Sequence, residues 1–157
     1  MVKRNSPARL FSLNNKVILT QTDTTVGLLS QDANRLREIK SRTQAKPFIQ
    51  VFNDFSILKQ QHIRIPKKFK KNVRRAKKTT FIVKNRAFRV ASAPLHSELL
   101  RRLEWSYSTS ANESGKNFQR DFCEQKADII IEDKRGLFEG KASKLYKINQ
   151  KRKKRLR

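Results

Sequence analysis

Strand-like runs alternate along this chain with segments whose apolar residues recur at the spacing of an α-helix. The strand-like runs are residues 17–19, 48–52, 79–84, 86–91, 129–131 and 145–148. The helical segments are residues 33–39, 54–60, 66–76, 95–103 and 118–122. Strands that alternate with helices predict a mixed α/β fold, in which helices pack against a sheet.

Some of these segments carry more specific signals. Asp32 is suited to cap the helix that has Lys40 at its C-terminal end. Asn85 separates two strand-like runs and predicts a β-hairpin. Three consecutive isoleucines at 129–131 predict a central strand buried on both faces, and residues 145–148 are expected to form the last strand.

The chain is strongly basic, with a net charge of +25 over 157 residues. Residues 64–78 hold nine cations and residues 151–157 hold six, and neither segment contains an acid. Such a charge attracts polyanions, so nucleic acid is the expected macromolecular partner, although a merely solvated surface is the alternative. Composition therefore divides the chain into one domain, residues 1–150, and a disordered basic tail, residues 151–157.

Other features exclude several classes of protein. No run approaches the roughly 20 apolar residues that a transmembrane helix needs, so no membrane partner is expected. The single cysteine, Cys123, cannot form an internal disulfide and is expected to be a buried side chain in a cytoplasmic protein. His62 and His96 have no partner ligands near them in sequence, so we expect surface or loop residues and no metal site.

Three short polar segments suggest a binding site for a polyphosphate. They are Thr22–Leu28, Lys40–Pro47 and Ser108–Asn112. Together they supply hydroxyls, an amide and three clustered cations, which can hold a triphosphate without a Walker loop. Each segment alone is a weak signal, because short polar strings recur by chance.

Taken in order, the three segments resemble the motifs of the YrdC-like family, and Ser110–Gly115 matches that family's Ser-Ala-Asn-x-Ser-Gly loop closely. The resemblance implies a twisted mixed sheet with helices on its faces and a basic concave groove. It also implies an L-threonylcarbamoyladenylate synthase. Such an enzyme uses L-threonine, bicarbonate and ATP, with magnesium, and releases pyrophosphate. Its product would pass to a tRNA threonylcarbamoyl transferase complex.

The resemblance also assigns roles to individual residues. Lys40 and Arg42 would be catalytic through their charge on the transferring phosphates. The residues expected to bind ATP are Arg42, Lys46, Thr80, Ser110, Asn112 and Arg157. Those expected to bind the amino-acid substrate are Thr24, Gln50, Lys84, Ser108 and Ser143. Arg157 is included because the family's late arginine follows its late serine by about fourteen residues, which would bring the tail back over the groove.

The chain departs from the family pattern at several positions. Val26 replaces a tyrosine, Gln50 replaces a histidine near the substrate, and Lys77–Thr79 replaces a Pro-Gly-Pro turn. Arg89 matches an arginine of the hairpin strand, with either a structural or a functional role. The alternative function is a non-catalytic relative that binds double-stranded RNA or tRNA, and a ribosome-associated basic protein is a third reading.

Overall fold

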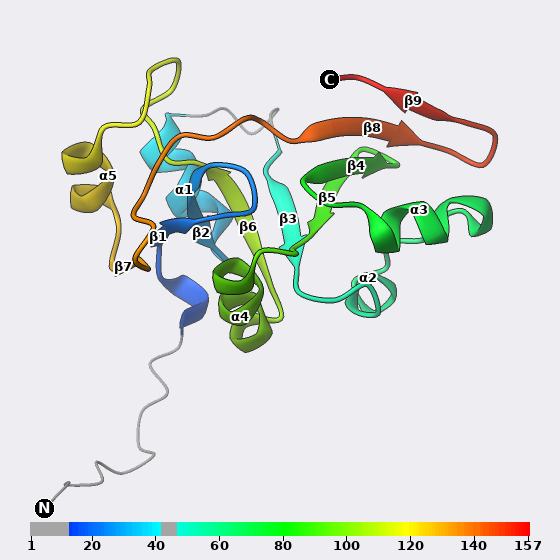
Figure 1. Ribbon diagram of the computed structural model, residues 1–157, viewed down its shortest axis with the longest axis horizontal. Helices are drawn as coiled ribbons and strands as arrows, with labels where there is room; N and C mark the ends of the chain where they lie inside the picture. Colours follow the sequence, from blue (N-terminus) through cyan, green and yellow to red (C-terminus); the bar gives the residue numbers. More distant parts are fainter. Residues whose placement is uncertain (1–12, 42–46) are drawn as a thin grey trace, which may run out of the picture.

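The computed structural model describes residues 13–41 and 47–157, and Figure 1 shows them arranged around one sheet. The helices are η1 (Leu13–Asn15), α1 (Ala33–Lys40), α2 (Ile57–Gln60), η2 (Lys67–Phe69), α3 (Lys70–Arg75), α4 (Pro94–Leu103) and α5 (Arg120–Lys126). The strands are β1 (Ile18–Gln21), β2 (Val26–Ser30), β3 (Ile49–Phe52), β4 (Thr79–Val83), β5 (Arg86–Val90), β6 (Trp105–Ser110), β7 (Ile129–Ile131), β8 (Lys144–Ile148) and β9 (Lys153–Arg155).

Across the described residues the strands form one nine-stranded sheet in the order β7-β1-β2-β6-β3-β5-β4-β8-β9. The pairs β1–β7, β3–β5 and β4–β8 are parallel, and the other neighbours are antiparallel. The sheet is therefore mixed, and the predicted α/β fold is confirmed.

Helices cover both faces of the sheet. Val17 and Leu19 pack with Leu36 of α1 and Cys123 of α5, whereas Ile18 packs with Leu99 and other residues of α4. Because neighbouring strand residues point to opposite faces, these two clusters lie on opposite sides of β1. The prediction that Cys123 is buried is confirmed, since none of its surface is exposed.

Local sequence signals explain where two elements begin and end. The Asp32 carboxylate accepts hydrogen bonds from the backbone N–H groups of Asn34 and Arg35, which caps α1 as predicted. The hairpin β4–β5 is also confirmed, and its turn residues Lys84 and Asn85 both have positive φ, 47° and 66°. A two-residue turn with positive φ at both positions matches the twist of antiparallel strands.

The structure corrects two predictions about strands. β7 is an edge strand and not a central one, because it pairs only with β1 among the described strands. Ile129 and Ile131 pack toward α4, whereas Ile130 points away and stays 44% exposed. β8 is not the last strand, because residues 153–155 of the supposedly disordered tail pair with it as β9.

A third cluster fixes the position of α3. Val73 of α3 packs against Phe81 and Val83 of β4 and against Ile148 of β8. The alternate residues of these strands, such as Thr80, Ile82 and Leu145, therefore point to the opposite face of the sheet. That opposite face carries a cavity, and Thr80, Ile82 and Leu145 are among the residues that line it.

Candidate functional site

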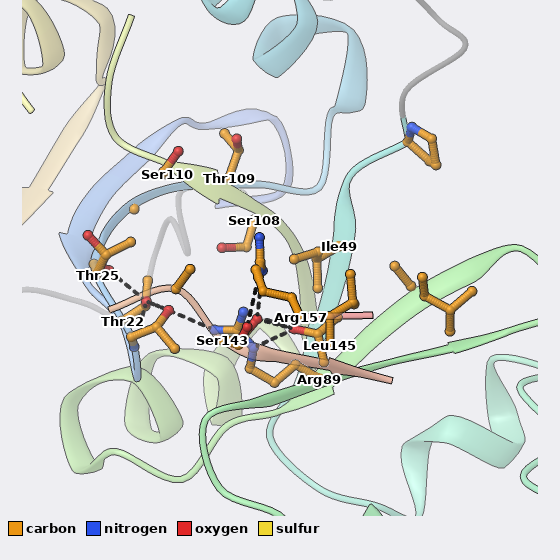
Figure 2. A pocket seen from close by; sticks show the side chains of 17 residues that line it. Thr22, Thr25, Ile49, Arg89, Ser108, Thr109, Ser110, Ser143, Leu145 and Arg157 are labelled. Atoms are coloured by element: carbon orange, nitrogen blue, oxygen red, sulfur yellow. Dashed lines mark hydrogen bonds between the residues drawn. The ribbon is translucent and has the colours of Figure 1, made fainter. Parts of the chain in front are cut away.

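The cavity has a volume of about 520 Å³, and residues from six strands, from three connecting segments and from the segment after β9 surround it (Figure 2). Its polar lining consists of Thr22, Thr24, Thr25, Thr80, Arg89, Ser108, Thr109, Ser110, Ser143 and Arg157. Its apolar lining includes Ile49, Ile82 and Leu145. No carboxylate lines it within the described residues, so the cavity favours an anionic ligand.

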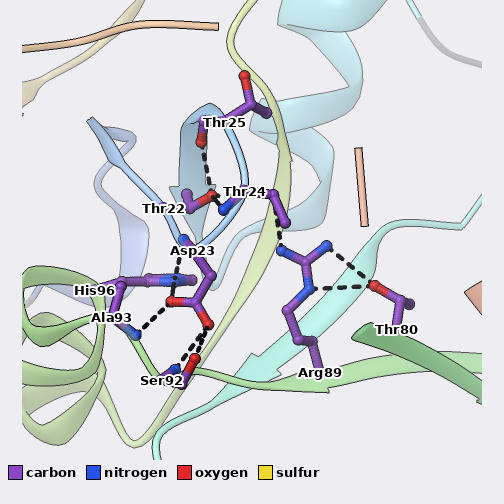
Figure 3. A network of polar contacts seen from close by, with 9 residues as sticks. All are labelled: Thr22, Asp23, Thr24, Thr25, Thr80, Arg89, Ser92, Ala93 and His96. Carbon is purple, nitrogen blue, oxygen red and sulfur yellow. Dashed lines mark hydrogen bonds and ion pairs between the residues drawn. The ribbon is translucent and has the colours of Figure 1, made fainter. Parts of the chain in front are cut away.

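Arg89 of β5 is the central cation of this cavity (Figure 3). Its guanidinium donates to Thr24 Oγ1 at 3.0 Å and to Thr80 Oγ1 at 3.0 and 3.2 Å. Only 6% of its surface is exposed. The pKa of Arg89 is lowered to about 10, chiefly by burial and more weakly by the charge of Arg157, against the opposing effect of Asp23. A buried guanidinium held by neutral hydroxyls is well placed to bind an anion.

Arg157 places a second guanidinium at the same cavity. Its side chain donates to the backbone oxygen of Ser143 at 3.0 Å and to Ser143 Oγ at 3.3 Å. Ser143 Oγ lies 2.9 Å from Thr80 Oγ1, which in turn accepts from Arg89. The two arginines are thus linked through two hydroxyls, and neither has a carboxylate partner in the part of the chain that the structure describes.

The turn between β1 and β2 is held by a buried carboxylate. Asp23 accepts hydrogen bonds from the N–H groups of Ser92 and Ala93, at 2.7 and 2.9 Å, where β5 leads into α4. Its Oδ1 also lies 3.1 Å from His96 Nδ1. His96 is fully buried on α4, where it faces this turn, so the prediction of a surface or loop histidine is wrong.

The charge of Asp23 should stabilise the folded state. Burial alone would raise its pKa, but His96 and the N–H groups of Ala93 and Ser92 lower the pKa of Asp23 to about 2 from 3.8. A carboxylate whose pKa is lower in the folded state stabilises the fold at any pH above its pKa in the unfolded state. That stabilisation is lost as the pH falls through the pKa of the folded state.

We therefore expect Asp23→Asn to lower the free energy of unfolding by about 2 kcal/mol above pH 4, since one unit of pKa equals about 1.4 kcal/mol. The difference from the unmodified protein should shrink between about pH 4 and pH 2. Urea unfolding across this range measures it, with Asp121→Asn on the exposed start of α5 as the control. A difference that does not change with pH would contradict the role of the charge.

Lys40, at the end of α1, contacts the loop that follows β6. Its ammonium donates to the backbone oxygens of Ser110 and Asn112 at 3.1 and 2.6 Å, and to Asn112 Oδ1 at 2.7 Å. Asn112 Oδ1 also accepts from the hydroxyl of Ser110 at 2.6 Å. Lys40 is only 2% exposed, so its observed contacts position this loop.

Gly140 lets the connection from β7 to β8 cross closely over the β1–β2 turn. A Cβ at this position would lie 1.9 Å from the backbone oxygen of Thr24, which no side chain could tolerate. The Gly140 N–H also donates to Thr25 Oγ1 at 3.1 Å. The crossing leads directly to Ser143 and so helps to close the cavity.

The structure brings six of the twelve site residues that the sequence predicted to this cavity. Thr24, Thr80, Ser108, Ser110, Ser143 and Arg157 all line the cavity. Asn112 lines a neighbouring cavity of about 280 Å³, which shares Thr25 and Ser110 with the first. Arg42 and Lys46 lie outside the described residues.

Two predicted substrate residues do not line the cavity. Gln50 is buried, and its Oε1 accepts from the guanidinium of Arg86 at 2.6 Å. Lys84 lies on the hairpin turn and lines a separate cavity with His62 and Arg64. The resemblance to the family placed both residues near the substrate. Gln50 points away from the cavity because its neighbour Ile49 points into it, and Lys84 lies on the tight turn at the end of the hairpin.

Arg89 is the cavity residue whose function the sequence did not specify. The sequence did indicate that Ala87 and Arg89 share one face of β5, because residues two apart in a strand point the same way. That face lines the cavity. Nothing in the sequence identified this as the ligand face.

Among the described residues, no group of three or more His, Cys, Asp or Glu side chains could hold a metal ion. None of the helices in that part of the chain is long and apolar enough to cross a membrane.

Fold and cavity together define a mixed α/β protein whose cavity is lined by hydroxyls and two arginines. Residues 12–157 match the model of the Sua5/YciO/YrdC domain, described as "Telomere recombination", and the chain belongs to this family. The resemblance seen in the sequence is thereby confirmed. No curated protein matches the chain.

Solved structures show the same fold. Pyrococcus abyssi Sua5 complexed with L-threonine has a TM-score of 0.72 at 20% identity, covering 90% of this chain and 50% of its own. Escherichia coli YciO has a TM-score of 0.69 at 22% identity, covering 91% of this chain and 82% of its own. Full-length HypF in a phosphate- and nucleotide-bound form has a TM-score of 0.72 at 16% identity, covering 90% of this chain and 26% of its own. The chain spans about half the length of the Sua5 structures that it matches.

Proposed function

We propose that this protein is an L-threonylcarbamoyladenylate synthase that supplies the threonylcarbamoyl group for tRNA modification. The observation that carries the proposal is the cavity in which Arg89 and Arg157, without carboxylate partners, converge with the hydroxyls of Thr24, Thr80 and Ser143. Membership of the family and the L-threonine bound in the Sua5 structure support this choice of substrate.

The reaction would proceed in two steps. The amine of L-threonine and bicarbonate first give a carbamate and water. A carbamate oxygen then attacks the α-phosphorus of ATP, the bond to the β-phosphate breaks, and pyrophosphate leaves. Both steps bring anions together, so the enzyme would act by positioning its substrates and offsetting their negative charge.

The cavity residues would divide between the two substrates. Arg89 would bind the carboxylate of threonine, with Thr24, Ser108 and Ser143 around the amino acid. For ATP, a guanidinium from Arg157 and hydroxyls from Thr80 and Ser110 would contact the nucleotide. The same role is proposed for the amide of Asn112 and, from the sequence, for Arg42 and Lys46. Magnesium would enter with ATP as part of the substrate and offset phosphate charge.

Pyrophosphate release tests the proposal directly. The protein is incubated with ATP, magnesium, bicarbonate and L-threonine, and each component is omitted in turn. Release that requires both threonine and bicarbonate is the expected result. Intact ATP binding without any release would contradict the enzyme and favour a non-catalytic, RNA-binding member of the family.

Arg157 gives a more specific prediction about ATP. Replacing Arg157 by Gln should weaken ATP binding about tenfold or more, because one charge-assisted hydrogen bond to phosphate contributes about 1.5–3 kcal/mol. Isothermal titration at 0.3 M salt measures this while screening long-range attraction. Lys154→Gln on β9 is the control, since Lys154 is exposed and does not line the cavity. Equal losses in both variants would mean that Arg157 acts only through net charge.

A further inference from the structure

The fold joins two basic segments that are about eighty residues apart in the sequence. The segment 64–78 contains η2 and α3 and leads directly into β4, while the segment 151–157 contains β9. β8 pairs with β4 and β9 pairs with β8, so both segments lie at the same end of the sheet (Figure 1). The ammonium of Lys68 also donates to the backbone oxygen of Lys151, which closes the gap between them.

We name ten of the exposed cations on η2, α3 and residues 151–155 the basic face. Its members are Lys67, Lys68, Lys70, Lys71, Arg74, Arg75, Lys151, Arg152, Lys153 and Arg155. The ion pairs in the described part of the chain all involve other cations. The Asp54 carboxylate lies near this surface, and its pKa is lowered by hydrogen bonds from Ser56 and, more weakly, by the charge of Arg74.

This arrangement disfavours the folded state. On α3, the pairs Lys70–Arg74 and Lys71–Arg75 place like charges one helical turn apart, which destabilises a helix. Lys70 and Lys71 also stand at the positive end of the helix dipole. Lysines on the edge strand β9 can be explained as protection against pairing with another chain, but this explanation does not apply to the cations on α3. A bound polyanion would relieve this repulsion on both elements.

The basic face is separate from the substrate cavity. Val73 of α3 packs on the side of the sheet to which Phe81 and Tyr146 point, whereas Thr80 and Leu145 line the cavity on the opposite side. Lys153 of β9 lies on the same side as α3, because its ammonium sits 4.9 Å from the centre of the Tyr146 ring. A ligand on the basic face therefore does not need to enter the cavity.

We propose that the basic face binds the phosphate backbone of a folded RNA. Lysines and arginines that are exposed, densely spaced and outside the ion pairs of the described residues fit a continuous row of phosphates. A shallow hollow of about 290 Å³ lies between Lys71 and Arg75, where a phosphate group could contact both cations. The choice of RNA over other polyanions rests on the proposed function, which ends in a modified tRNA.

The experiment compares two double variants with equal changes in charge. Lys71→Glu with Arg75→Glu alters the basic face, and Lys126→Glu with Lys134→Glu alters exposed positions on and after α5 and β7, near the other edge of the sheet. Binding to unmodified tRNA is measured by titration at about six salt concentrations between 0.05 and 0.3 M. Binding to anionic phospholipid vesicles is measured under the same conditions. Circular dichroism checks that each variant is folded, and pyrophosphate release with the small substrates is measured on the same samples.

The basic-face variant should bind tRNA at least about tenfold more weakly, and its dependence of log affinity on log salt should be shallower by about 1–2. The tRNA affinity of the control variant should change by less than about threefold.

Equal losses of tRNA affinity in the two variants, or a preference for vesicles over tRNA, would overturn the proposal. If tRNA binding behaves as expected but no variant releases pyrophosphate, the proposed enzyme fails and the RNA surface stands. If pyrophosphate is released but the basic-face variant binds tRNA as tightly as the unmodified protein, the proposed enzyme stands and the RNA surface fails.

Discussion

Replacing Arg89 by Ala should lower threonine-dependent pyrophosphate release about a hundredfold. Its guanidinium is the buried cation of the cavity, and the hydroxyls of Thr24 and Thr80 hold it in place at about 3 Å. A charge-assisted hydrogen bond contributes about 1.5–3 kcal/mol, or roughly ten- to over a hundredfold. We expect the largest effect on the KM for L-threonine, since we assign its carboxylate to Arg89. Steady-state kinetics at saturating ATP measures it.

Two further variants make the Arg89 test decisive. Arg89→Lys keeps the charge but loses the two-pronged geometry, so it should recover only part of the activity. Lys84→Asn is the contrasting variant, because the sequence places Lys84 at the substrate carboxylate whereas the structure places it on the hairpin turn. Asparagine tolerates the positive φ of 47° at this position. A loss in Lys84→Asn as large as that in Arg89→Ala would show that the cavity has been assigned to the wrong cation.

The sequence predicted the elements of the fold well where local chemistry determines them. Asp32 caps α1, and the Lys84–Asn85 turn closes the hairpin, because both signals act within a few residues. Strand order depends on distant pairings, and this is why Ile129–Ile131 were wrongly placed at the centre of the sheet. The apolar triplet is explained by its packing toward α4 on one face only.

The candidate site followed a similar pattern. Motif residues such as Ser110 and Ser143 line the cavity, because their spacing in the motifs reflects a shared fold. The face to which a strand residue points could not be derived without the sheet, so Arg89 was left undecided and Gln50 was assigned to the substrate. The buried position of His96 was missed for the same reason, since its partner Asp23 lies 73 residues away. Composition predicted a disordered tail, but pairing with β8 turns part of it into β9.

Replacing Lys40 by Met should weaken ATP binding and lower the melting temperature together. The buried ammonium donates to three oxygens of the Ser110–Asn112 loop, and Met would leave these acceptors without their donor. A hydrogen bond to a charged group contributes about 1.5–3 kcal/mol, and each kcal/mol corresponds to about 2–4 °C in a chain of this size. The loop would also lose the position in which Ser110 and Asn112 meet the nucleotide, so we expect ATP affinity to fall at least about tenfold.

The combination of the two readouts separates the possible roles of Lys40. A side chain that acted only by contacting phosphate would lower ATP affinity without a change in melting temperature, whereas an anchor of the loop lowers both. Lys116→Met is the matched control, because Lys116 belongs to the same loop but forms an exposed ion pair with Glu113 at 2.6 Å. Exposed ion pairs contribute about 0–1 kcal/mol, so this variant should leave both quantities nearly unchanged. If Lys40→Met lost ATP affinity at an unaltered melting temperature, the ammonium would be a phosphate ligand, as the sequence motif first indicated, and the contacts to the loop would be secondary.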